Sequence, residues 1–339
     1  MVNARGYISS NFTKSFLTIF LPFFLIISLV YLVKISSLTS QIQITFSELL
    51  RLYLYATPNI IFYTLPLSFV AALANLLIRL SMENELIAFY ALGHKASKMI
   101  GGLMTVGLLF SVLLLSISFL GMPLSKQLYK SFVEQKKTEA KVNIVPGKLG
   151  QKFGDYYIYV KEKKEDDFQN IVIYNRTKKN EEQFFSSQKG KLKKSDGTTS
   201  LLLEDGYGYT YTKEKLQQAK YSSLEVFDSS KKTNYVFEDV VAYWMRAKND
   251  KKIMHRALFF IFVSLIPLLS IYLVASFTMI NPRYQENHSF IVIFATSLVL
   301  YMIASSLEKW GSVTLLLLFI VLTMAIGRWL FQKRVAKYF

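Results

Sequence analysis

The chain has 339 residues, of which 52% are apolar and 15% aromatic, and its formal net charge is +17. This composition is too apolar for an ordinary soluble domain, yet it is not apolar throughout. There are no cysteines, which excludes disulfides, thiol catalysis and thiolate metal sites. The three histidines, His94, His255 and His288, lie in different segments, so we expect neither a metal site nor a bound cofactor.

Six stretches are apolar enough to cross a hydrocarbon core of ~30 Å. They are residues 16–33, 60–78, 99–120, 257–280, 289–305 and 313–330, and the fifth is the shortest. Between the third and fourth stretches, residues 123–252 hold 26 Lys/Arg and 18 Asp/Glu, whereas the other 209 residues hold 14 and five. The sequence therefore predicts three transmembrane helices in 1–122, a soluble domain in 123–252 and three more transmembrane helices in 253–339.

Basic residues near short loops predict the orientation, because they stay preferentially on the cytoplasmic side. The cytoplasmic set is Arg5, Lys14, Arg79, Lys95, Lys98, Arg283, Lys333, Arg334 and Lys337. The smaller opposite set is Lys34, Arg51, Arg256 and Lys309. We therefore expect both termini in the cytoplasm and the 123–252 domain outside it.

The inserted domain is predicted to be all-β in its middle, about residues 146–237, with helical flanks. The segments "DYYIYVKEK", "NIVIYN", "EEQFFSSQKGKLK", "TSLLLEDGYGYTYT" and "YSSLEVF" are rich in β-branched and aromatic residues and are separated by turn-forming clusters. Their spacing indicates a β-sandwich or a partly open β-roll. Strands that are apolar on both sides favour a packed core over a groove lined from inside.

The segment of about residues 81–98, "SMENELIAFYALGHKASK", joins the second and third predicted spans. On a helix, Leu86, Phe89, Tyr90 and Gly93 share one side at i, i+3, i+4 and i+7, and Glu85 borders that side. A helix lying on the inner leaflet is one interpretation. However, an anionic leaflet repels acids such as Glu83 and Glu85. Docking into a groove on a protein partner with basic residues is therefore favoured.

Catalytic signatures are missing from the sequence. The Gly-Lys pairs in "PGKLG" and "KGKLK" lack the other residues of a phosphate-binding loop, and no G-x-S-x-G or H-E-x-x-H occurs. The predicted spans hold almost no ionisable groups in their interiors, where an intramembrane enzyme or proton pump needs them. We expect no enzymatic activity in this chain, so any energy must come from elsewhere.

Four segments resemble one family, the YjgP/YjgQ proteins, which are LptF/LptG-type permeases. The segments are "RGYI" (5–8), "ENELIAFYALG" (83–93), "MHRALFFIFVSLIP" (254–267) and "INPRY" (280–284). The last one favours the LptF-like branch. The resemblance also covers the whole plan of three spans, an external β-domain and three spans. It implies an α-helical polytopic membrane protein with six transmembrane helices and an inserted periplasmic jellyroll-like domain.

The resemblance implies a permease subunit of the lipopolysaccharide-export ABC transporter in a Gram-negative inner membrane. Its expected partners are a cytoplasmic ATPase dimer, a paralogous permease, a single-span jellyroll bridge protein and lipopolysaccharide, without nucleic acid. ATP would be hydrolysed in the separate ATPase subunit. The segment 81–98 becomes the coupling helix, with Glu83, Glu85, Leu86, Phe89, Tyr90 and Gly93 as its contact residues. Lys34 and Arg256 become candidate contacts for lipid phosphates, against the alternative that they are only interfacial anchors.

Two alternatives remain at this point. One is the permease of another ABC-type lipid or lipoprotein exporter, although such proteins usually have four spans with the large domain after the first. The other is a membrane-anchored periplasmic sensor, which we would expect to carry a cytoplasmic signalling domain, whereas about nine residues follow the sixth span.

Overall fold

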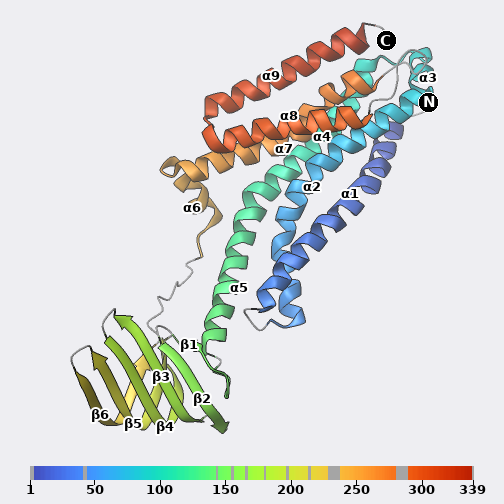
Figure 1. The fold of residues 1–339 in the computed structure, drawn as a ribbon. Helices are drawn as coiled ribbons and strands as arrows, with labels where there is room; N and C mark the ends of the chain where they lie inside the picture. Colours follow the sequence, from blue (N-terminus) through green and yellow to red (C-terminus); the bar gives the residue numbers. More distant parts are fainter. Residues whose placement is uncertain are drawn as a thin grey trace. The chain divides into compact units, whose positions relative to one another are not determined.

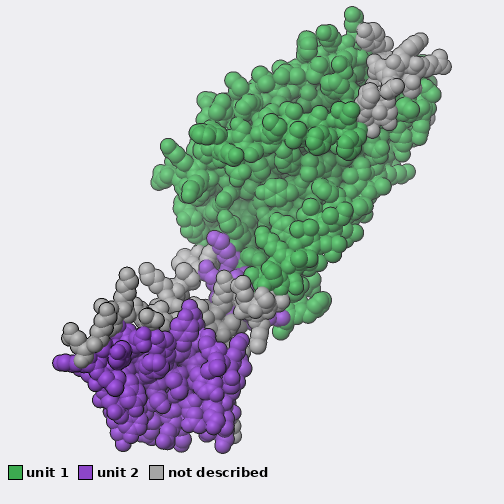
Figure 2. All heavy atoms as spheres, viewed as in Figure 1, with its two compact units in different colours: residues 1–38, 45–129, 237–339 green, residues 39–44, 130–236 purple. Residues whose placement is uncertain are grey.

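The structure is a computed structural model, and it describes residues 4–40, 44–142, 144–153, 156–164, 167–178, 181–195, 198–212, 215–227, 237–279 and 289–337. Two compact units divide the chain (Figure 2). Unit 1 comprises residues 1–38, 45–129 and 237–339, and unit 2 comprises residues 39–44 and 130–236.

Unit 1 is helical (Figure 1). Its helices are α1 (Ala4–Ser36), α2 (Phe46–Met82), α3 (Glu85–Ala91), α4 (Ala96–Ser116), α5 (Met122–Val142), α6 (Val240–Met245), α7 (Lys251–Thr278), α8 (Ser289–Trp310) and α9 (Val313–Phe331). The part of α5 that follows Tyr129 belongs to unit 2. A π-helical turn at Ile117–Gly121 joins α4 to α5, so that these form one long helix. In the part of the chain that the structure describes, six helices are long and apolar enough to cross a membrane, which confirms the predicted six spans.

Helices α2 and α7 form the centre of unit 1. In their most apolar stretches 72% and 67% of the residues are buried, against 11% in α1. Helix α7 contacts α2, α4, α8 and α9, whereas α1 packs on α2 and α4. Helices α1, α8 and α9 therefore keep long apolar surfaces exposed, which a bilayer or a second subunit can cover.

Small residues let α4 approach α7 closely. A Cβ atom on Gly107 would lie 2.6 Å from Cδ1 of Ile271 and 3.2 Å from the carbonyl oxygen of Pro267. Ser118, in the π-helical turn after α4, and Ser264 of α7 place their hydroxyl oxygens 3.4 Å apart, within hydrogen-bond range. In a membrane, acyl chains are as apolar as the side chains of a neighbouring helix, so apolar contact alone does not hold two helices together. Close packing and polar pairs such as these stabilise the contact instead.

Unit 2 contains one antiparallel sheet of six strands in sequence order. The strands are β1 (Gln151–Phe153), β2 (Tyr156–Lys164), β3 (Asp167–Lys178), β4 (Glu181–Ser195), β5 (Thr198–Thr212) and β6 (Leu216–Phe227). This confirms the predicted inserted all-β domain. Five strands match the predicted segments, and the short β1 was not predicted. Of the two predicted alternatives, the partly open β-roll agrees better with this single sheet, because a β-sandwich consists of two sheets.

One face of the sheet carries the core of unit 2. Its register places Ile158 opposite Ile173 and Leu201 opposite Val226, all of them buried. Gly206 lies on this face where the sheet is tightest, because a Cβ atom there would lie 2.2 Å from the carbonyl oxygen of Ser186. The packed-core interpretation of these strands agrees with this burial.

Candidate functional site

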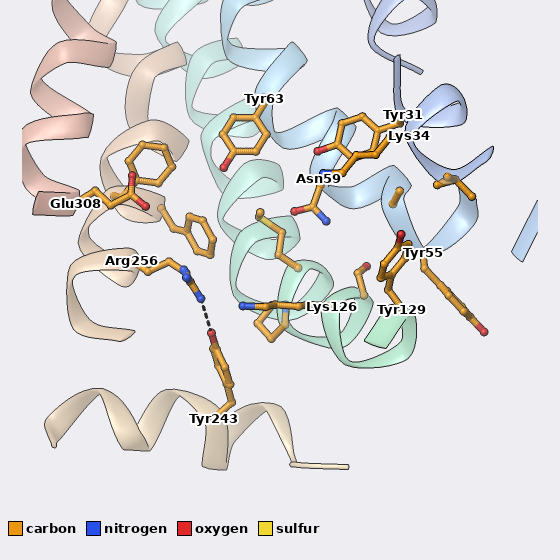
Figure 3. Close-up of a pocket in the computed structure, with 17 residues that line it drawn as sticks. Tyr31, Lys34, Tyr55, Asn59, Tyr63, Lys126, Tyr129, Tyr243, Arg256 and Glu308 are labelled. Atoms are coloured by element: carbon orange, nitrogen blue, oxygen red, sulfur yellow. Dashed lines mark hydrogen bonds between the residues drawn. The ribbon is translucent and has the colours of Figure 1, made fainter. Parts of the chain in front are cut away.

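A cavity of about 400 Å³ lies in unit 1 (Figure 3), at the end of the helices opposite α3 (Figure 1). Lys34, in the last turn of α1, and Arg256, in the second turn of α7, both line it. The two residues are 222 positions apart in the chain, and they were predicted separately. The fold therefore brings both candidate lipid-phosphate residues to one site, which is called the basic pocket below.

The charge of the basic pocket is predominantly positive. Three cations, Lys34, Lys126 and Arg256, line it together with one carboxylate, Glu308. Figure 3 shows the Lys126 amino group and the Arg256 guanidinium pointing toward one another. Two like charges directed into one cavity favour an anionic ligand between them, since such a ligand relieves their repulsion.

Tyrosines and an amide supply the neutral polar lining. They are Tyr31, Tyr55, Asn59, Tyr63, Tyr129 and Tyr243. The Lys34 amino nitrogen lies 5.8 Å from the centroid of the Tyr31 ring, a cation–π distance. Phenol hydroxyls donate or accept hydrogen bonds, and their rings offer flat apolar faces. This lining suits a ligand that combines acidic groups with sugar rings.

Helix α6 covers one side of the basic pocket and is anchored to the bundle. The Tyr243 hydroxyl accepts a hydrogen bond from Arg256 at 3.3 Å (Figure 3). Next to it, the Trp244 indole donates to the carbonyl of Phe119 at 2.8 Å, and their rings lie 4.8 Å apart. Arg256 is therefore oriented by a neutral partner, which leaves its positive charge uncompensated by that contact.

The two chain segments that lead to and from the inserted domain are tied together beside the basic pocket. The Gln127 amide donates to the Glu238 carbonyl at 3.1 Å and accepts from the Glu238 backbone N–H at 2.9 Å. Arg246 forms an ion pair with the Glu238 carboxylate. Gln127 is buried, so this bidentate contact fixes where α5 leaves unit 1 and where the chain returns.

At the other end of unit 1, the predicted helix in 81–98 is present as α3. Two left-handed residues delimit it: Asn84 (φ 58°) separates it from α2, and Gly93 (φ 79°) ends it. The Gly93 N–H donates to the Tyr90 carbonyl at 2.9 Å. Figure 1 shows the start of α1 and the end of α9 at the same end of the helical bundle as α3. All three features lie at the end of the bundle expected to face the cytoplasm.

The predicted apolar side of α3 faces the bundle itself. Leu86 is 4% exposed, and Phe89 and Tyr90 are half-buried against the same core. Burial raises the pKa of the Tyr90 phenol, so it stays protonated. Gly93 and Glu83 are exposed. The opposite side of α3 presents Ile87 (40% exposed), and Leu92, directly after the helix, is 73% exposed.

Glu85 is half-buried at the start of α3 and is held by a residue of α1. The Tyr7 hydroxyl lies 2.9 Å from each of the two Glu85 carboxylate oxygens. The Tyr7 ring also contacts Phe89, with centroids 6.1 Å apart. This contact was not predicted, although Tyr7 lies within the quoted "RGYI" segment.

The sequence model of the Lipopolysaccharide export system permease LptF/LptG family matches residues 6–333, nearly the whole chain. The chain belongs to this family. No curated protein sequence matches it. The match covers both ends of the bundle, and therefore the basic pocket and α3, as well as the inserted sheet. Six apolar helices in a permease family make this a multi-pass membrane protein, as predicted.

The family match does not separate the LptF and LptG branches, and the "INPRY" segment (280–284) lies entirely outside the described residues. The LptF-like assignment thus stays a prediction.

Among the described residues, no group of three or more His, Asp or Glu side chains could hold a metal ion.

Proposed function

We propose that this chain is one permease subunit of an ABC transporter that extracts lipopolysaccharide from the inner membrane of a Gram-negative bacterium. The released lipid passes to a periplasmic bridge toward the outer membrane. The basic pocket carries the proposal: three cations and a row of tyrosines gather at one end of the spans. At the other end, α3 offers an exposed apolar contact for an ATPase.

The energetics of lipid extraction explain why both ends are needed. Exposing acyl chains to water costs about 0.8 kcal/mol per CH₂ group, so a lipid with several chains does not leave the bilayer unaided. The anionic phosphates of its headgroup lie at the membrane interface, where the cations of the basic pocket would bind them. The lipid is then held at the interface while ATP hydrolysis in a separate subunit supplies the work.

The proposal is tested by depleting the protein in cells and locating newly made lipopolysaccharide. We expect the lipid to accumulate in the inner membrane, because no other route removes it. Normal delivery to the cell surface after complete depletion would refute the function.

We infer that α3 is the coupling helix and that its exposed residues contact the ATPase dimer. Leu86, Phe89 and Tyr90 fix α3 on the bundle, whereas Ile87 and Leu92 are available to a groove on a partner. Glu83 and Glu85 add negative charge that complements basic residues there. The apolar side predicted from the sequence therefore supports the helix, and its opposite side makes the contact.

Replacing Leu92 by Asp is expected to reduce ATPase association at least tenfold, since it places a charge in an apolar contact. Glu85→Lys is expected to weaken the same association or to uncouple hydrolysis from transport. The measurement is co-purification of the ATPase with the permease, followed by ATP hydrolysis and lipid release.

Leu149→Asp is the matched control, because Leu149 is a similarly exposed leucine (78%) in unit 2. Wild-type ATPase stoichiometry and unchanged lipid release in Leu92→Asp and Glu85→Lys would contradict the assignment of α3.

Two further partners follow from exposed surfaces. The apolar surfaces of α1, α8 and α9 support pairing with a paralogous permease. In the sheet, β6 is an edge strand of 12 residues, whereas the other edge, β1, has three. An edge strand can add a strand from another domain through backbone hydrogen bonds. We therefore propose β6 as the edge that meets the jellyroll of the bridge protein.

The proposal places both termini and α3 in the cytoplasm and the sheet in the periplasm. Basic residues support this orientation, because Lys333 and Arg334 follow α9 at the end that carries α3.

A further inference from the structure

Helix α1 connects the two candidate sites of unit 1. It is one continuous helix of 33 residues, which corresponds to about 50 Å. Tyr7 lies in its first turns beside α3, and Lys34 lies in its last turn at the basic pocket. Pro22 removes one backbone hydrogen bond inside α1, but the helix continues on both sides of it, so a displacement at one end is expected to reach the other end.

The polar side-chain contacts that the structure describes between α1 and other helices go either to α2 or to α3. Ser15 donates to the Ala72 carbonyl at 3.2 Å, and Tyr53 of α2 donates to Ser28 at 3.0 Å. Both contacts join α1 to α2. In contrast, Tyr7 donates to Glu85 of α3, 78 positions away.

We propose that Tyr7 is the positioning residue that makes α1 follow α3, so that motion of the coupling helix reaches the basic pocket through α1. The inference rests on the proposed function. Sequence order alone would predict transmission only through α2 and α4, the helices that flank α3. The Tyr7 hydroxyl contacts both oxygens of the Glu85 carboxylate, and the Tyr7 ring contacts Phe89. Tyr7 is therefore bound to two residues of α3.

The hydrogen bond suits this task because one partner is charged. A hydrogen bond from a hydroxyl to a carboxylate is stronger than a hydrogen bond between two neutral groups. Yet Tyr7 is 39% exposed, so water weakens the bond and lets it break and re-form within a transport cycle. Phe89 keeps the ring in place while the hydroxyl re-forms its bond.

The test is Tyr7→Phe in the complete complex of both permeases and the ATPase, reconstituted in vesicles that contain lipopolysaccharide. This variant keeps the ring and removes only the hydroxyl. We expect wild-type ATPase stoichiometry and continued ATP hydrolysis, while lipid released per ATP falls about two- to fivefold, the size of one exposed charge-assisted contact. Tyr53→Phe is the matched control, since it removes a hydroxyl that joins α1 to α2. It should leave lipid release per ATP unchanged.

A second measurement begins with the wild-type Tyr7, so its first result does not depend on how well the Tyr7→Phe variant folds. The chain has no cysteine, so spin labels can be placed by cysteine substitution at Ser10 of α1 and at Lys95, two residues after the Gly93 turn that ends α3; both positions are exposed. In the otherwise wild-type complex, the distance between the labels should stay constant when a non-hydrolysable ATP analogue binds. With Tyr7→Phe added, it should change.

Each outcome decides the inference. A changed label distance in the wild-type background overturns it, as does a Tyr7→Phe variant with normal release per ATP. Loss of ATPase binding in Tyr7→Phe also overturns it, because Tyr7 would then act in docking. If Glu85→Lys and Leu92→Asp leave transport intact as well, the proposed function of α3 itself fails.

Discussion

The contribution of Arg256 to lipid binding can be predicted from its surroundings. Its guanidinium is half-buried, lines the basic pocket and donates only to the neutral Tyr243 hydroxyl among the contacts that the structure describes for it. Replacement by Ala removes one of three cations and leaves the cavity open. A hydrogen bond between charged groups contributes about 1.5–3 kcal/mol in a protein. Partial exposure lowers this to about 1–2 kcal/mol, or roughly a five- to thirtyfold weaker Kd.

The assay for Arg256→Ala is binding of a purified diphosphorylated lipid A probe to the permease in nanodiscs. Lys309→Ala is the control, because Lys309 is an exposed cation at the end of α8 that does not line the basic pocket. It should change Kd less than twofold, since exposed charges at a distance are screened by salt. Equal effects of the two variants, or none from Arg256→Ala, would refute the assignment of the basic pocket.

Two other predictions follow from packing and from strand pairing. Gly107→Val should lower the free energy of unfolding by about 1–3 kcal/mol, because the added atoms overlap Ile271. The measurement is the Tm of the purified permease, and a Tm equal to that of the wild type would show that α4 and α7 separate without cost. A photocrosslinker at Ser222 of β6 should capture the bridge protein, whereas one at Lys152 of β1 should not; the reverse pattern would move the contact to the other edge.

Local sequence patterns predicted most of the secondary structure of this chain. Apolar stretches of span length, and strand segments around 156–227 that are rich in β-branched and aromatic residues, depend on residues that are close in the sequence. From its spacing Gly93 was expected on the helix beside Leu86, whereas α3 ends at Ala91 and Gly93 has a positive φ, which glycine adopts without strain. The short β1 escaped detection because three residues are too few for a periodic signal.

Contacts between distant residues depended on the tertiary structure. Lys34 and Arg256 could each be selected as interfacial cations, but only helix packing shows that they share a pocket with Lys126. The apolar side of α3 could be read from its spacing, yet spacing does not distinguish a side that docks on a partner from one that packs on its own bundle.

The sequence by itself determined the number of spans, the inserted all-β domain and the position of a short helix near Glu85. The tertiary structure decided which side of that helix is exposed and that Tyr7 holds its carboxylate. The physical reason is the range of the forces: hydrophobic periodicity and backbone preferences act within a few residues. The pocket and the Tyr7 contact depend on how helices far apart in the chain pack together.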